Sequence, residues 1–446
     1  MLELAVNKKD TLIRALAALY LAILAVITCF MLEWMFKLPT IKYHDYAKYY
    51  AAAKIVTSNQ SHRIYDLDYQ NEVWQDLSHE SKTGRKVTLE ISPIWPPFLV
   101  PFGNLPILNA YWLWQACWIS CGVIGIFSVL RSVHGSTPIW TNVYRTFILV
   151  IATLACLPEA RGMVLGQPCW LILGFVAGFC AAFIAKRDIA AGIMLAISTL
   201  KFQYSPFLGI AALASRRWKM IIVAAVVFFA LSVSSASIIG ADTFIHGPLT
   251  LLQWDSNKDL EIDINPQSMV NFRGILSTLL SPEIAMKSSF FLMLTGLLLT
   301  LKVWLDAIRI GSKTIPWALS FTVAAFLLFS AHVHMYECVV LVVLPALTFP
   351  TFDPVKLLAT KDWRMRAWIW LLVSYPILLW FVFLLDVKLF HIVVNGSNLS
   401  VLTVFALNLI NVVLLLLAAA NLYGMKDKTA SEIAGASEDL LPTPNQ

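Results

Sequence analysis

Charged residues are scarce in this sequence: they make up 13% of its 446 residues, against about 25% in soluble domains. An ordinary water-soluble domain is therefore excluded, because hydrophobic residues reach 59% and the mean hydropathy is +0.72. Such values fit many spans of about 20 apolar residues rather than one anchor. The composition predicts an all-α integral membrane protein whose single membrane domain covers residues 1–425.

Patterns typical of metal centres and of repeat proteins are also missing. The seven cysteines lie within or at the ends of apolar runs without metal-ligand spacing, so we interpret them as small apolar residues. There is no heptad, solenoid period or low-complexity tract. The formal charge of +6 does not indicate nucleic acid as a partner, because the basic residues occupy short turns rather than one patch.

Apolar runs along the chain predict a polytopic helical bundle of about 12 transmembrane helices. The first run is too long for the apolar region of a signal peptide and lacks a small-residue cleavage site, so it should remain as a membrane anchor. The stretch 189–214 fits either one tilted span or two short helices meeting at Lys201. The other runs lie near 12–36, 108–130, 143–157, 169–185, 220–240, 288–308, 314–330, 335–350, 367–385 and 399–423.

Lysine and arginine recur at every second turn between these runs, which predicts that both termini are cytoplasmic. Both flanks of 189–214 are basic, so this alternation favours two passes there. The opposite, extracytoplasmic side then has two large loops, 37–107 and 241–287, of which the first should include interfacial helices. Its shorter loops are 158–168, 331–334 and 386–398. The polar tail 426–446 is predicted to be disordered in the cytoplasm.

The first large loop contains a candidate catalytic acid. Asp45 and Tyr49 are four residues apart in an alanine-rich segment that favours helix, so they share one face of it. We expect this helix at the membrane interface with its aromatic rings at headgroup level. The alternative for Asp45 is a solvated acid stabilised at a helix start. The prolines between 93 and 106 predict an extended crossing of the outer surface.

Several short motifs occur in order along the chain. They are Asp45 with Tyr49-Tyr50-Ala51-Ala52, Tyr65-Asp66, Pro96-Pro97-Phe98, Leu105-Pro106, Gly166-Gln167, Lys201 with Pro206, Asn265 with Gln267-Ser268, and His334-Tyr336-Glu337 before Leu344-Pro345. The set resembles glycosyltransferase family 87. Members have the multi-span GT-C fold and transfer mannose or arabinose from a polyprenyl-phosphate donor. The resemblance implies this fold and a multi-pass location in the cell membrane.

The resemblance also implies roles for individual residues. Asp45 would be the catalytic base, because family members have an acid at this position in the first outer loop. The donor phosphate needs positive charge or hydrogen-bond donors, and the donor site would consist of Lys201, His334, Arg161, Gln167, Tyr49, Asn265 and Gln267. Three alternatives without a catalytic or binding role remain open. Lys201 could snorkel to the interface, Arg161 could pair with Glu159, and His334 could be an ordinary surface residue.

A metal site and a transport function are the two alternatives to consider. His332, His334 and Glu337 could suggest a metal site, but no second cluster matches, so no metal and no cofactor is predicted. A secondary transporter or lipid flippase would also need many spans and a buried lysine. It should show two related halves and polar residues near the midplane, which the sequence does not. The predicted partners are a polyprenyl-phosphate sugar donor, a lipid-linked or envelope glycan acceptor, and membrane lipids.

Overall fold

The computed structural model describes residues 2–37, 45–78, 86–256, 260–261, 269–389 and 401–438, and these residues are almost entirely helical. The first half contains α1 (Leu2–Lys37), α2 (Asp45–Val56), η2 (Ser61–Arg63), α3 (Leu67–Ser78), α4 (Pro96–Gly103), α5 (Ile107–Val133), α6 (Ile139–Leu154), α7 (Leu157–Leu165), α8 (Cys169–Ile184), α9 (Asp188–Ile197), η3 (Ser198–Lys201), α10 (Ser205–Ala214) and α11 (Trp218–Ile239). The second half contains α12 (Ala241–Ser256), α13 (Phe272–Leu279), α14 (Pro282–Ile310), η5 (Ser312–Thr314), α15 (Ile315–Phe329), η6 (Met335–Val342), α16 (Val343–Thr348), α17 (Pro354–Leu358), α18 (Trp363–Leu389) and α19 (Val401–Glu438). Strands β1 (Lys86–Val87) and β2 (Leu260–Glu261) pair in parallel, with Lys86 opposite Leu260 and Val87 opposite Glu261.

Each apolar run of the sequence forms a helix, but the helices differ in length. Within the described residues, seven helices are long and apolar enough to cross a membrane, or eight if the bent pair α6 and α7 is one span. The runs near 169–185, 189–200, 204–214 and 335–350 form shorter apolar helices. An integral membrane protein is therefore confirmed, and the count of 12 spans stays a prediction.

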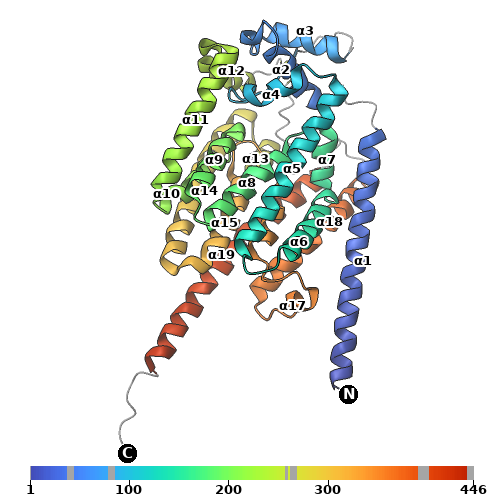
Figure 1. Ribbon diagram of the computed structural model, residues 1–446, viewed down its shortest axis with the longest axis vertical. Coiled ribbons are helices and arrows are strands. Elements are labelled where there is room, and N and C mark those ends of the chain that lie inside the picture. Colours follow the sequence, from blue (N-terminus) through green and yellow to red (C-terminus); the bar gives the residue numbers. More distant parts are fainter. Residues whose placement is uncertain are drawn as a thin grey trace, which may run out of the picture.

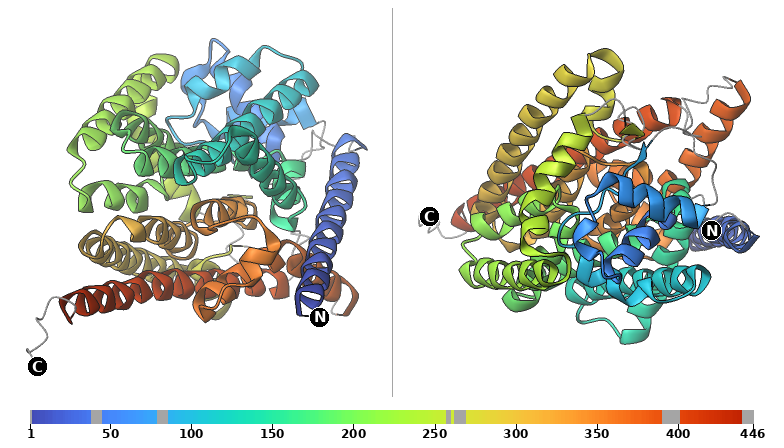
Figure 2. Two further views of the ribbon diagram at one scale, coloured as in Figure 1. Left: turned by 60° about the horizontal axis from the view of Figure 1, so that its bottom comes forward. Right: turned by 90° about the horizontal axis from the view of Figure 1, so that it is seen from above.

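Helices α8 and α15 form the centre of the bundle. Both are buried along nearly their whole length, because they are apolar on every side and are surrounded by other helices. α8 packs on α5 and α9, and α15 packs on α14 and α19. The gold-to-red helices from α14 onward lie side by side next to the green and cyan helices of the first half, while α1 stands at one side (Figure 2, left).

A cap of short helices covers one end of the bundle, at the top of Figure 1. It consists of α2, α3, α4 and α12, and the C-terminal end of α11 packs against α4 and η2. The predicted helix at Asp45 is present, but Tyr46 and Tyr50 point into the core rather than outward. α1 begins and α19 ends at the opposite end of the molecule (Figure 1).

The prediction of an extended crossing between 93 and 106 is wrong, because α4 occupies Pro96–Gly103. Pro96 and Pro97 lie in the first turn, where a helix needs no backbone N–H donor, and their fixed φ angle suits a helix start. Only Pro101 lies inside the helix. A cluster of prolines therefore marks a helix start here rather than an interruption.

The stretch 189–214 folds as two short helices rather than one tilted span. α9 and α10 run in opposite directions, because Asp188 at the start of α9 forms an ion pair with Arg217 just beyond the end of α10. Pro206 lies in the first turn of α10 and suits its start. The hairpin places Lys201 at its tip, away from the basic turns at its open end.

Two predicted loops and the tail also contain helix. The outer loop 158–168 forms α7, which is bent by 75° from α6, and the loop 241–287 includes α12 and α13. α19 continues to Glu438, beyond Lys426, where the sequence predicts disorder. Short helices of mixed polarity escape a search for long apolar runs, which explains why α7, α12 and α13 were not predicted.

Candidate active site

Asp45, Gln167 and Tyr49 form one hydrogen-bonded group beneath the cap. Gln167 Nε2 donates to Asp45 Oδ2 at 2.6 Å, and the Tyr49 hydroxyl donates to Gln167 Oε1 at 3.2 Å. Asp45 and Tyr49 lie on successive turns of α2, as their spacing predicts, whereas Gln167 follows the end of α7. The carboxylate is therefore held by a residue 122 positions away in the chain.

A tight turn after α7 places Gln167 against α2. Gly166 has a left-handed φ of 71°, and the backbone N–H of Gln167 donates to the Gly162 carbonyl at 2.9 Å. A Cβ atom added at Gly166 would lie 2.4 Å from the Cβ of Tyr46. Trp114 Nε1 donates to the Gly166 carbonyl at 3.0 Å. Only glycine fits this turn, which explains the Gly166-Gln167 motif in physical terms.

Lys201 forms a buried ion pair with Glu337. Lys201 Nζ lies 3.2 Å from Glu337 Oε1, and the exposed fractions of the two side chains are 15% and 0%. Glu337 Oε2 accepts from the backbone N–H of His334 at 3.0 Å and so caps η6. Snorkelling of Lys201 to the interface is therefore wrong, because its ammonium group points at a buried carboxylate.

The segments around Lys201 and His334 are bonded side by side. Gln203 Nε2 donates to the His332 carbonyl at 3.0 Å, and Ser330 Oγ donates to the Gln203 carbonyl at 3.1 Å. Trp95 Nε1 reaches the tip of the same hairpin, where it donates to the Leu200 carbonyl at 3.1 Å. The tip is thus fixed from two sides, and Lys201 has little freedom to move.

The two histidines lie directly after α15, as predicted. Their rings are 4.6 Å apart, and the His334 ring stacks on Tyr336 at 5.4 Å. Burial, His334 and the cations Lys201 and Arg273 lower the pKa of His332 well below its usual value. Glu337 faces Lys201 and the backbone of His334. Among the described residues, no group of three His, Cys, Asp or Glu side chains could hold a metal ion.

Arg161 lies on α7 within electrostatic range of Asp45 and Tyr336. The alternative pairing with Glu159 is wrong. Glu159 is fully buried, and one of its carboxylate oxygens accepts a weak hydrogen bond from Cys169 Sγ at 3.5 Å. Arg161 forms no ion pair with any described residue. Its charge interacts over a longer distance with the Asp45 carboxylate.

Electrostatic interactions at Tyr49 show that these groups share one site. Burial raises the pKa of Tyr49 to about 12, the Lys201 charge lowers it, and Asp45, Glu337 and Glu90 raise it. These charged groups come from α2, η3, η6 and the segment before α4. Tyr49, which is bonded to Gln167, is therefore close enough to both Asp45 and Lys201 to be influenced by their charges.

Some predicted residues have a different role or no described position. Asn265, Gln267 and Ser268 lie outside the described residues. The Tyr65-Asp66 motif builds the cap: Tyr65 donates to the Ile91 carbonyl, and Asp66 accepts from the backbone of Tyr69 at the start of α3. All seven cysteines are free thiols.

Glu90, Gln203 and Trp95 belong to the site but were not predicted from the sequence. Glu90 and Gln203 are single polar residues without a repeating pattern, so their positions near Lys201 and Tyr49 depend on the fold. Trp95 lies in the proline-rich segment that the sequence predicts to be extended. A buried tryptophan N–H usually has a hydrogen-bond partner, but the burial of Trp95 and its bond to the Leu200 carbonyl are seen only in the fold.

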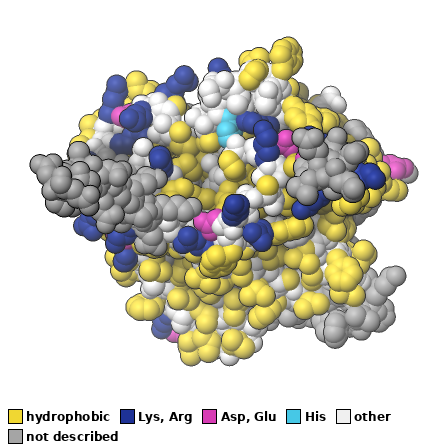
Figure 3. Space-filling view, turned by 90° about the horizontal axis from the view of Figure 1, so that it is seen from below, with side chains coloured by type: hydrophobic (Ala, Val, Ile, Leu, Met, Phe, Trp, Pro, Cys, Tyr) yellow, Lys and Arg dark blue, Asp and Glu magenta, His cyan; other side chains and the backbone are white. Residues whose placement is uncertain are grey.

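The basic residues gather at the other end of the bundle, where Figure 3 shows dark blue side chains around the lower face. Helices α8 and α15 each have one end at the site and the other at a basic turn. The exposed residues of these turns are Arg131, Lys186, Arg187, Arg216, Lys219, Arg309, Lys313, Lys356, Lys361 and Arg366. The charge pattern therefore distinguishes the two ends of the molecule as the sequence predicts.

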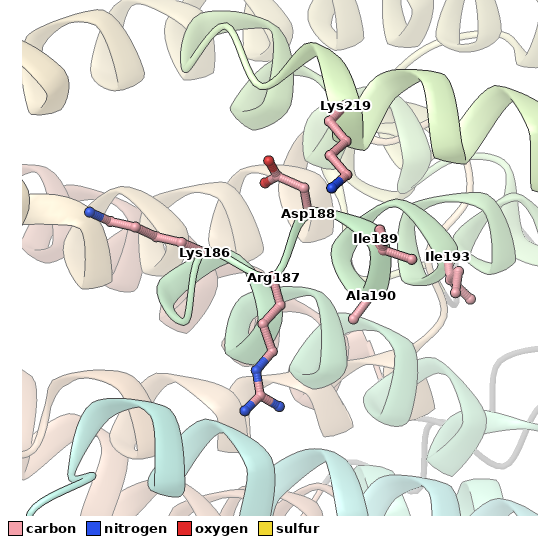
Figure 4. A pocket seen from close by; sticks show the side chains of 7 residues that line it. All are labelled: Lys186, Arg187, Asp188, Ile189, Ala190, Ile193 and Lys219. Carbon is pink, nitrogen blue, oxygen red and sulfur yellow. The ribbon is translucent and has the colours of Figure 1, made fainter.

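A cavity of about 460 Å³ lies at this basic end, between the start of α9 and the start of α11. It is lined by Lys186, Arg187, Asp188 and Lys219 together with apolar residues. Figure 4 shows that the side chains of Lys186 and Arg187 point away from each other and from Lys219. These cations do not converge on one ligand position, and the cavity is separate from the Asp45 site.

Comparison with known proteins identifies the family. A model of glycosyltransferase family 87 matches residues 92–345, which is more than half of the 446 residues. The matched range includes Gln167, Lys201 and His334 but not Asp45 or Tyr49. Neither the curated proteins nor the solved structures gave a match. This chain, with its many apolar helices, is a membrane protein that belongs to glycosyltransferase family 87.

Proposed function

We propose that the protein is a GT-C type enzyme that takes a sugar of the mannose or arabinose class from a polyprenyl-phosphate donor. The acceptor is a lipid-linked or cell-envelope glycan. The observation that supports this most is the Asp45 carboxylate held by Gln167 within electrostatic range of Arg161. A base beside a cation is the arrangement that transfer from a sugar phosphate requires.

In this proposal Asp45 takes the proton of the acceptor hydroxyl through Oδ1, the oxygen that Gln167 does not use. As the O–H bond breaks, the acceptor oxygen forms a bond to the anomeric carbon of the sugar. The bond between that carbon and the phosphate oxygen breaks, and polyprenyl phosphate leaves with the electron pair. Attack opposite the leaving group inverts the anomeric configuration, by analogy with inverting hydrolases.

The donor phosphate is proposed to lie near Arg161, Lys201 and His334. Lys201 already pairs with Glu337, so much of its charge is compensated and Arg161 supplies most of the positive charge. Asn265 and Gln267 remain proposed sugar ligands. No metal or cofactor is part of the proposal, because the cations of the chain supply the charge that the departing phosphate needs.

The proposed topology places both termini in the cytoplasm and the site on the extracytoplasmic face, with residues 1–425 as one membrane domain. It is supported by the basic residues at the end opposite the cap, since short cytoplasmic loops accumulate lysine and arginine.

Cysteine labelling tests this topology. Asp76→Cys on α3 and Lys219→Cys on α11 introduce exposed thiols at opposite ends of the bundle. In intact cells, a membrane-impermeant maleimide is expected to label Asp76→Cys, whereas Lys219→Cys should react only after permeabilisation. The unsubstituted protein, with its seven cysteines, sets the background. The reverse pattern would invert the topology.

A donor panel tests the function. Membranes from cells that express the protein are incubated with radiolabelled polyprenyl-phosphate mannose, polyprenyl-phosphate arabinose and the matching nucleotide sugars. Transfer from one of the lipid-linked donors alone is the expected result, and it identifies the sugar. Flipping of the labelled lipid across the membrane without transfer would favour the lipid flippase instead.

A further inference from the structure

We infer that Gln167 is a positioning residue that orients the Asp45 carboxylate, and that it is not a ligand of the donor. The inference rests on the proposed function, because it takes Asp45 as the base. It replaces the donor-binding role that the family resemblance implies for Gln167.

The hydrogen bonds of Gln167 fix the direction of its amide. Oε1 accepts from the Tyr49 hydroxyl, so Nε2 must point toward Asp45 Oδ2. A flipped amide would turn Oε1 toward the carboxylate and lose the hydrogen bond to Asp45. The residue is also only 8% exposed, which leaves it little surface for contact with a sugar or a phosphate.

The backbone beneath Gln167 is equally restrained. The left-handed Gly166 turn packs on Tyr46, the neighbour of Asp45 in α2, and the Gly166 carbonyl accepts from Trp114. Gln167 and Asp45 are therefore fixed to each other through side chains and through backbone packing. A carboxylate held in this way keeps a constant direction, as a general base requires.

Several charged and polar groups surround Asp45. Arg161 on α7 and the hydroxyls of Tyr49 on α2 and Tyr336 on η6 lie within electrostatic range of its carboxylate. Lys201, Glu337 and Glu90 act on the same Tyr49 hydroxyl. The Gln167 N–H joins the carboxylate to this group through a hydrogen bond. Loss of that N–H should leave the carboxylate free to rotate away from the acceptor hydroxyl.

Kinetics of Gln167→Ala separate positioning from donor binding. In the radiolabelled polyprenyl-phosphate transfer assay, we expect kcat to fall about 10- to 100-fold, the effect of losing one hydrogen bond to a charged group. The KM for the donor should change less than about twofold, because only the interaction with the base is lost.

Gln167→Glu and Gln75→Ala complete the series. The glutamate replaces the N–H donor with a second negative charge beside Asp45, so its kcat should fall further than that of Gln167→Ala. Gln75 is a half-buried residue of α3 in the same cap, and its alanine variant should match the wild type. A raised donor KM with an unchanged kcat in Gln167→Ala would overturn the inference.

A second measurement needs no sugar transfer. Labelling of Asp45 by a hydrophobic carbodiimide at one fixed pH, followed by peptide mass spectrometry, reports how the carboxylate is presented. The labelling rate should rise in Gln167→Ala, because the hydrogen bond that covers Oδ2 is lost. Equal labelling rates in wild type and variant would overturn the inference even if Asp45 is the base. A raised rate together with a fully active Asp45→Asn protein would instead refute only the proposed function.

Discussion

Replacing Asp45 with asparagine is expected to lower sugar transfer by about 10²- to 10⁴-fold, the usual contribution of a general base. The amide oxygen of asparagine can still accept the hydrogen bond from Gln167, so the geometry of the group is kept while the base is lost. The measurement is the rate of labelled sugar transfer in membranes that contain equal amounts of wild-type and variant protein.

Asp76→Asn provides the matched control for this substitution. Asp76 is an exposed acid of α3 in the same cap, and its variant should transfer sugar at the wild-type rate. If Asp45→Asn is folded and transfers as fast as the control, Asp45 has no part in the reaction.

The second large effect is expected at the buried ion pair. Glu337→Gln keeps an acceptor for the His334 N–H but removes the charge that faces Lys201. A lysine left buried without its partner should lower the free energy of unfolding by about 3–5 kcal/mol. Lys201→Met alone leaves the carboxylate unpaired and should be similarly destabilising. The measurement is denaturant titration of the purified protein in mixed micelles.

The double variant Lys201→Met with Glu337→Gln distinguishes a true pair from two independent residues. Because it removes both charges together, it should be more stable than either single variant. The exposed pair Lys287 and Glu283 on α14 is the control, and Glu283→Gln should cause no measurable loss of stability. Additive losses in the double variant would show that the two charges do not stabilise each other.

The helices could be predicted from the sequence because the apolar runs are local features. Each long run, such as α5, α11 and α14, is present near its expected position. The basic turns also placed Lys186 and Lys219 together at one end of the bundle, and the structure has both beside the same cavity. Hydropathy and charge patterns can be recognised within about 20 consecutive residues. These predictions therefore needed no knowledge of contacts between distant segments.

The site could be predicted only in part, because its contacts join distant segments. The sequence singled out Asp45, Lys201, Gln167 and Glu337, but it did not predict that Gln167 bonds to Asp45 or that Glu337 pairs with Lys201. Those partners lie 122 and 136 positions away along the chain, and no local pattern specifies such a pairing. Helix α4 was missed for another reason, since Pro96 can begin a helix as well as interrupt one.

The assignment of the chain to family 87 leaves the donor to be determined. Transfer by the purified protein in liposomes, with radiolabelled polyprenyl-phosphate mannose or arabinose beside the corresponding nucleotide sugar, is the most direct test. We predict that one lipid-linked donor is used, that the nucleotide sugar is not, and that Asp45→Asn abolishes the product. Equal transfer from the nucleotide sugar, or undiminished transfer by Asp45→Asn, would contradict this mechanism.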